Sequence, residues 1–156
     1  IISVTELERD DFVKIEAELD LAQSLEINLS CPNVKSARWD RIHIFPNKYR
    51  EWCIAKMAPT STIEEIAFVV NAGFKQLHFS NTLPTARGGL SGPTLIPYTT
   101  NLITMCREEF PHTTIIAGGG VTKEAHVNHY MDAGADHISV GSAWFNPIKT
   151  YRLLSK

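Results

Sequence analysis

Short apolar runs alternate with helix-like segments along the whole chain. Six of these runs have the length and the buried, partly alternating pattern of strands. They are Ile1–Val4, Leu25–Leu29, Cys53–Met57, Gln76–Ser80, Thr114–Ala117 and His137–Val140. Repeated alternation of strands and helices predicts parallel strands joined by right-handed crossovers, and therefore an α/β fold. The alternation alone leaves open whether the sheet is open or closed into a barrel.

Two of the segments between strands carry clear helix boundaries. The stretch Ser61–Glu64 has the spacing of a capping box, and the apolar positions after it predict a helix that stops at Gly73. Thr122–Glu124 opens a second predicted helix, which closes at Gly134. The region Lys35–Arg50 is weakly patterned, and we expect an irregular loop there, which is either part of the active site or a plain surface excursion.

The bulk properties fit one domain with a hydrophobic core. A chain of 156 residues is long enough for such a core, and we expect residues 1–156 to form a single domain. A net charge of −2 gives no basic field that would attract nucleic acid or an anionic membrane. No apolar run reaches transmembrane length, and no secretory leader is visible. The chain begins at Ile1, inside a predicted strand, so we expect a fragment of a longer protein.

The three cysteines do not form a recognisable framework. Cys31, Cys53 and Cys106 are odd in number and widely spaced, which argues against disulfides and for a reducing compartment. None lies in a CxxC pair, so the sequence does not predict structural zinc. Cys53 and Cys106 lie in apolar patterns typical of inert packing. Cys31, which follows "EINLS", could by itself be a buried filler, a metal ligand, a disulfide partner or an acid–base group.

Two glycine-rich turns follow neighbouring predicted strands. Gly118–Gly120 leads from a strand into a helix, and Gly141 with Ser142 ends the next strand. Glycines let backbone N–H groups approach an anion, and a helix N-terminus adds a favourable dipole. The last two units of a (β/α)₈ barrel bind phosphate in this way. The pair of turns therefore predicts a phosphate site, and two tight turns without a ligand are the alternative.

Other polar residues are predicted to gather at strand ends. Asn28, Asn33, Asn81 and Thr82 suit the orientation of a planar ligand rich in amide and carbonyl groups, although each alone could be a turn or capping residue. Lys56 ends the apolar strand "WCIAKM" and, if buried, needs an anionic partner. The alternative is a surface lysine at a frayed strand end.

Taken together, these motifs resemble the dihydroorotate dehydrogenases, a family of FMN-dependent (β/α)₈ barrels. The resemblance rests on "EINLSCPN", "IAKMAP", "SNT", "GGLSGPTLIP", "IIAGGGV" and "AGADHISVGSA", in the order of the family and over nearly the whole chain. The first predicted strand corresponds to the third of the family. The implied fold is an α/β (β/α)₈ TIM barrel that is incomplete at its N-terminus, with about six of the eight βα units.

The resemblance implies a function and a role for each site residue. The implied reaction is FMN-dependent oxidation of dihydroorotate to orotate in pyrimidine biosynthesis, in a cytoplasmic homodimer with no nucleic-acid, membrane or metal partner. Cys31, as in the soluble class, would take the C5 proton while hydride leaves C6 for flavin N5. Lys56 would lie near flavin N1 and O2, where its charge stabilises the reduced anionic flavin. The implied substrate contacts are Asn28, Asn33, Asn81 and Thr82. The implied FMN contacts are Asn28, Lys56, Ser80, Gly92, Gly119, Gly120, Gly141 and Ser142.

Two other functions remain open at the level of sequence. The tRNA-dihydrouridine synthases are also FMN barrels with a cysteine loop, and "VGSAWFNP" faintly resembles their ending. The motif "GGLSGP" and the lack of a basic face argue against them. A catalytically inactive barrel fragment, which binds a phosphate compound or a protein partner, is the third possibility. The missing strands favour it, whereas retention of Cys31, Lys56 and both glycine turns opposes it.

Overall fold

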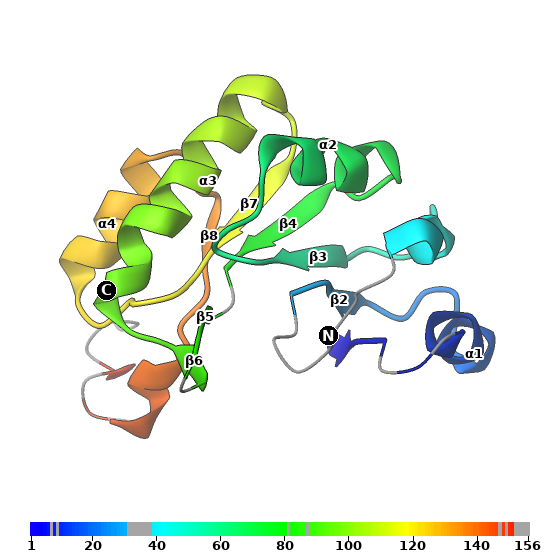
Figure 1. The fold of residues 1–156 in the computed structure, drawn as a ribbon, viewed down its shortest axis with the longest axis horizontal. Helices are drawn as coiled ribbons and strands as arrows, with labels where there is room; N and C mark the ends of the chain where they lie inside the picture. Colours follow the sequence, from blue (N-terminus) through cyan, green and yellow to red (C-terminus); the bar gives the residue numbers. More distant parts are fainter. Residues whose placement is uncertain are drawn as a thin grey trace.

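Six strands form one parallel sheet whose order follows the chain, β1-β2-β3-β4-β7-β8. The computed structural model describes residues 1–6, 8, 10–30, 39–80, 82–86, 88–146, 148, 150 and 151. The strands are β1 (Ile2–Val4), β2 (Leu25–Asn28), β3 (Cys53–Met57), β4 (Gln76–Phe79), β7 (Thr114–Ala117) and β8 (His137–Ile138). Figure 1 shows them fanning out from β1, near the N-terminus, to β8. Consecutive βα units of a (β/α)₈ barrel have this sequential parallel order.

The helices lie along one side of this sheet (Figure 1). The α-helices whose bounds the described residues give are α1 (Asp11–Glu18), α2 (Ile63–Asn71), α3 (Ile96–Glu109) and α4 (Glu124–Asp132). Three short 3₁₀ turns are η1 (Trp39–Ile44), η2 (Pro93–Leu95) and η3 (Ser142–Phe145). Directly after β4, strands β5 (Leu83–Thr85) and β6 (Gly88–Leu90) form a separate antiparallel hairpin. The hairpin therefore lies at the carboxyl end of β4.

The predicted strands are all present, with small differences at their ends. β3 and β7 have the predicted bounds, and the other four strands are one or two residues shorter. β2 stops at Asn28 because the Asn28 side chain accepts a hydrogen bond from the Ser30 N–H, at 3.2 Å, and closes a turn. The expected loop over residues 35–50 is wrong in part, since it contains η1 and the fully buried Phe45.

The capping box of α2 begins one residue later than predicted. Thr62, not Ser61, is the N-cap, and its hydroxyl accepts a hydrogen bond from the Glu65 N–H at 3.3 Å. The Glu65 carboxylate accepts in return from the Thr62 N–H at 3.0 Å. Ser61 is instead buried before the helix. Two further helices, α1 and α3, were not recognised in the sequence.

Alternation along the strands separates an apolar face from a polar one. On β2, β3 and β4 every second side chain faces the helices and is buried, because successive side chains point to opposite sides of a sheet. These positions are Leu25, Ile27, Cys53, Ala55, Met57, Leu77 and Phe79. The opposite face carries Glu26, Lys56 and His78 at intervening positions, together with the buried Ile54. A barrel places such a face in its interior, where the strands lead towards the active-site end.

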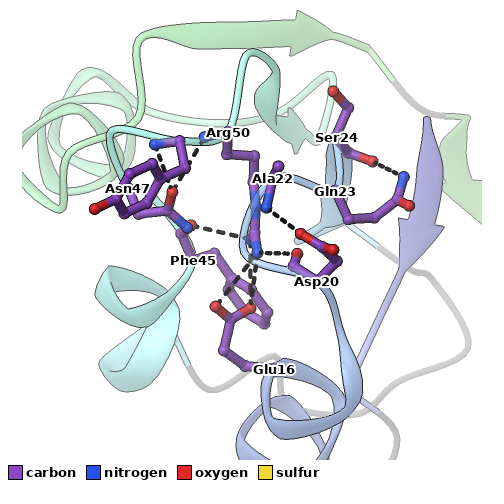
Figure 2. A network of polar contacts seen from close by, with 9 residues as sticks. Glu16, Asp20, Ala22, Gln23, Ser24, Phe45, Asn47 and Arg50 are labelled. Atoms are coloured by element: carbon purple, nitrogen blue, oxygen red, sulfur yellow. Dashed lines mark hydrogen bonds and ion pairs between the residues drawn. The ribbon is translucent and has the colours of Figure 1, made fainter.

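The buried Arg50 links α1 to the segment before β3 through hydrogen bonds and an ion pair (Figure 2). The Arg50 guanidinium is completely buried and donates to both carboxylate oxygens of Glu16 at 3.3 Å. It also donates to the carbonyl oxygens of Phe45, at 3.0 Å, and Asp20, at 3.4 Å. A buried charge is tolerated only with such partners. This network lies at the amino end of β3, the end of a barrel that contributes stability rather than catalysis.

Candidate functional site

The structure gathers half of the predicted site residues around one pocket at the carboxyl ends of the strands. Lining it are Lys56, Ser80, Thr82, Gly119, Gly120 and Gly141. His78, Ser91, Leu95, Val121 and Ser139 complete the lining. The pocket volume is ≈ 160 Å³. Sites that enclose a whole drug-sized ligand measure roughly 300–1,000 Å³, so this pocket would enclose one end of such a ligand.

The turn after β7 has a backbone that only glycine adopts without strain. Gly119 and Gly120 have φ angles of +86° and +76°, in the left-handed region. A Cβ on Gly120 would lie 2.6 Å from the Gly92 carbonyl oxygen and 2.8 Å from Pro93 Cα. Gly92, a predicted cofactor contact, thus packs its backbone directly against the turn. The sequence predicted a special turn here, and these angles give its physical reason.

Side chains from two helices hold the carbonyl groups of this turn. Thr99 on α3 donates its hydroxyl to the Gly118 carbonyl oxygen at 3.1 Å. Tyr130 on α4 donates to the Gly119 carbonyl oxygen at 2.7 Å. His126 Nδ1 lies 3.0 Å from the Gly120 carbonyl oxygen. Burial raises the pKa of Tyr130, which keeps its hydroxyl protonated as a donor. All three carbonyl groups therefore point towards the helices.

These contacts direct the N–H groups of the turn into the pocket. In a planar trans peptide the N–H points opposite to the preceding C=O, and the only cis bond among the described residues is Phe79–Ser80. The N–H groups of Gly119, Gly120 and Val121 consequently point away from the helices, and all three residues line the pocket. None of these N–H groups makes a hydrogen bond to a residue that the structure describes. Such a row of unpartnered donors suits an anionic group such as phosphate.

A single carboxylate holds both basic side chains of the pocket. Glu26 Oε2 lies 2.7 Å from Nδ1 of His78, and Oε1 lies 3.4 Å from Nζ of Lys56. The Ser3 hydroxyl also donates to Glu26 Oε1, at 2.8 Å. The Lys56 side chain is only 23% exposed. Lys56 is thus a paired, largely buried lysine, as its position in an apolar strand required, and not a surface residue at a frayed end.

The Glu26 carboxylate is ionised throughout the physiological range. Burial by itself would raise its pKa, but the hydrogen bond and charge of His78 and the charge of Lys56 outweigh burial and lower the pKa to about 2. Sequence reasoning did not select Glu26 or His78 as site residues. The available signal was that each is a polar residue inside an otherwise apolar strand.

The remaining predicted residues divide into two groups. Asn28 lies opposite Lys56 in the strand register, and its Oδ1 also accepts from the Ser30 hydroxyl at 3.2 Å. Ser142 begins η3, directly after Gly141. Cys31, Asn33 and Asn81 lie outside the described residues, so their roles stay predictions.

The two described cysteines behave as packing residues. Cys53 and Cys106 are buried, and burial raises the pKa of each thiol to about 11. Neither thiol would ionise near neutral pH, which fits the interpretation as inert core residues. In the described part of the chain, no group of three His, Cys, Asp or Glu side chains could hold a metal ion. The helices found there are also too short or too polar to cross a membrane.

Comparison with known proteins identifies the family. Residues 41–154, more than half of the chain, match the family model described as dihydroorotate dehydrogenase. The chain belongs to the dihydroorotate dehydrogenase family. This membership confirms the resemblance seen in the motifs.

Curated relatives match over most of this chain but over only part of their own length. The catalytic subunit of dihydroorotate dehydrogenase B (NAD⁺) from Thermotoga petrophila is 31% identical over 81% of this chain and 54% of the relative. The same subunit from Desulforamulus reducens is 29% identical over 99% of this chain and 60% of the relative. A putative dihydroorotate dehydrogenase A (fumarate) from Aquifex aeolicus is 27% identical over 93% of this chain and 58% of the relative. The chain spans little more than half the length of these relatives.

Solved structures confirm the predicted fold class. A dihydroorotate dehydrogenase from Eimeria tenella, in complex with ferulenol, superposes with a TM-score of 0.73 at 22% identity, over 92% of this chain and 51% of that chain. The ligand-free enzyme from the same organism gives a TM-score of 0.66 at 24% identity, over 83% of this chain and 49% of that chain. The family fold is the (β/α)₈ barrel, and the six-stranded parallel sheet is part of it.

Proposed function

We propose that this chain belongs to an enzyme that oxidises dihydroorotate to orotate with FMN as its cofactor, a step of pyrimidine biosynthesis. One observation carries the proposal. In a member of this family, one pocket joins a lysine held by a carboxylate to three N–H groups that have no partner among the described residues. The names of the relatives include both NAD⁺ and fumarate. The proposal therefore concerns the half-reaction from dihydroorotate to flavin.

The described residues fit two parts of FMN. The N–H groups of Gly119, Gly120 and Val121 would donate to the phosphate, with Gly141 beside them in the pocket. Ser80 lines the same pocket, and Gly92 packs its backbone against Gly120. Lys56 would place its ammonium group at the flavin ring. When bound, FMN supplies the acceptor for the hydride that leaves C6 of dihydroorotate. The paired charges of Glu26 and Lys56 keep the ammonium group in place.

The proton chemistry is assigned to Cys31 from the motif "EINLSCPN". A thiolate at this position would take the proton from C5 of dihydroorotate as hydride departs from C6. Asn28, Asn33, Asn81 and Thr82 would bind the carboxylate and amide groups of the substrate, because amide and hydroxyl side chains both donate and accept. Thr82 lies in the pocket and Asn28 beside Lys56, which supports this assignment.

Replacement of Cys31 tests this function directly. In Cys31→Ala, reduction of bound FMN by dihydroorotate is expected to slow by at least about 100-fold, because a positioned general base contributes 10²–10⁴-fold. FMN affinity should stay unchanged. Anaerobic stopped-flow absorbance of the flavin measures the rate. Cys53→Ala, which removes a buried thiol of the core, is the matched control and should reduce at the wild-type rate. Equal rates in both variants would contradict the assignment of the base.

Replacement of Tyr130 tests the phosphate site. Tyr130→Phe removes the hydrogen bond to the Gly119 carbonyl group, so the following N–H is no longer held towards the pocket. We expect affinity for FMN to fall about tenfold, the equivalent of one hydrogen bond to a charged group. Affinity for riboflavin, which lacks the phosphate, should not change. Fluorescence titration of both flavins measures the two affinities. An equal loss for both would point to general loosening of the fold instead.

A further inference from the structure

His78 is a buried polar residue of the pocket that neither the motifs nor the proposed reaction uses. It is 7% exposed and lies on β4, next to Lys56 on β3 in the strand register. On its other side, β7 leads into the glycine turn. His78 therefore stands between the lysine proposed to meet the flavin ring and the N–H groups proposed to bind the phosphate.

The contact with Glu26 fixes the tautomer of this histidine. The Glu26 carboxylate is ionised and can only accept hydrogen bonds. The 2.7 Å contact therefore requires the proton on Nδ1 of His78. Nε2 is then an acceptor in the neutral imidazole and a donor in the imidazolium. In either form it is directed away from Glu26.

Nε2 has no partner among the described residues. It lies 3.1 Å from the point where a Cβ on Gly118 would stand, at the start of the glycine turn, and no hydrogen bond joins it to a residue that the structure describes. His78 lines the pocket, and its Nε2 is not among the fully buried polar atoms without a partner in the described part of the chain, so solvent reaches it from the pocket. A ligand group in this pocket can displace that solvent and bond to Nε2. The fitting group is a hydroxyl, because a hydroxyl donates to the neutral ring and accepts from the charged one.

We propose that Nε2 of His78 binds the ribityl hydroxyl chain of FMN, and that Glu26 is the positioning residue that orients the ring for this contact. The inference rests on the proposed FMN binding. The ribityl chain is the part of FMN that joins the phosphate to the ring, and His78 stands between the residues assigned to those two parts. The carboxylate of Glu26 thus serves two ligand contacts, through Lys56 and through His78.

Two substitutions separate this contact from the structural role of the ring. In His78→Asn the amide nitrogen replaces Nδ1 and can still donate to Glu26, but no atom replaces Nε2. In His78→Gln the terminal amide reaches the position of Nε2. The probes are FMN, riboflavin, which lacks the phosphate, and lumiflavin, which has a methyl group in place of the ribityl chain. Thermal unfolding of each variant without flavin gives the change in stability separately.

Fluorescence titration should give a distinct pattern across the three flavins. His78→Asn is expected to bind FMN and riboflavin about tenfold more weakly and lumiflavin unchanged, as loss of one buried hydrogen bond implies. His78→Gln should lie close to the wild type. Three results for His78→Asn would overturn the inference: an equal loss of affinity for all three flavins, a loss of affinity for FMN alone, or no loss of affinity for any of them. Wild-type protein that binds none of the three would overturn the proposed function as well, so the two failures are distinguishable.

Discussion

The Gly120→Ala variant is expected to bind FMN at least about 100-fold more weakly than the wild type. An alanine Cβ would stand 2.6 Å from the Gly92 carbonyl oxygen and 2.8 Å from Pro93 Cα, and both are backbone atoms that cannot rotate away. The turn must shift, and its N–H groups then lose their common direction. Loss of two hydrogen bonds to a charged phosphate, each worth about 1.5–3 kcal/mol, corresponds to this factor or more.

The matched control is Gly134→Ala, which shares the backbone strain but not the location. Gly134 has φ of +108°, and the atoms nearest to a Cβ there belong to the Arg107 side chain, at 3.4 Å. It follows α4 and does not line the pocket. Both variants should lose stability, because alanine is strained in a left-handed backbone conformation. Only Gly120→Ala should also lose affinity for FMN. Equal FMN affinity in the two variants, measured by fluorescence titration, would contradict the proposed phosphate site.

Acid should remove about 3 kcal/mol of stability through Glu26 alone. The pKa of this carboxyl is about 2 in the folded protein, against an ordinary value of 4.5. The unfolded chain therefore binds more protons between these values, and the stabilisation, complete above about pH 5, is lost as pH falls towards 2. A difference of this size corresponds to about 3 kcal/mol at 1.36 kcal/mol per pH unit. Urea unfolding at a series of pH values measures the free energy of unfolding.

Glu26→Gln should remove this contribution, because an amide does not titrate. Its free energy of unfolding is expected to depend less on pH below 5 and to approach that of the wild type at pH 2. Glu18→Gln, which changes an exposed carboxyl at the end of α1, should keep the wild-type dependence. If Glu26→Gln and Glu18→Gln gave the same pH profile as the wild type, the Glu26 cluster would not have the stabilising role derived from its geometry.

Much of the sheet could be predicted because its strands have a simple pattern. β3 was predicted with its correct bounds because Cys53–Met57 is a short apolar run interrupted only by Lys56. α3 was missed because its pattern is mixed: its buried positions include Thr99 and Cys106, and Pro97 stands near its start. The buried threonine proves to hold a carbonyl group of the glycine turn. A residue chosen for a polar contact of this kind weakens the apolar periodicity on which helix prediction depends.

The site was predictable where chemistry lies in a local motif and not where it depends on distant strands. The glycine turn and Lys56 could be recognised because each lies at the end of its own strand. The contact between Glu26 and His78 joins residues 52 positions apart, and it follows from strand register and side-chain distance. Nothing in the local sequence of either strand specifies that pairing. The same holds for Thr99 on α3, whose buried hydroxyl finds its acceptor, the Gly118 carbonyl oxygen, in the following βα unit.

The most direct test of the proposed function is anaerobic addition of dihydroorotate to the purified protein loaded with FMN. The visible absorption of the flavin should bleach, with one orotate formed for each flavin reduced, and dithionite added to a parallel sample should produce the same bleaching. Protein that holds FMN and is bleached by dithionite but not by dihydroorotate would contradict the assigned reaction.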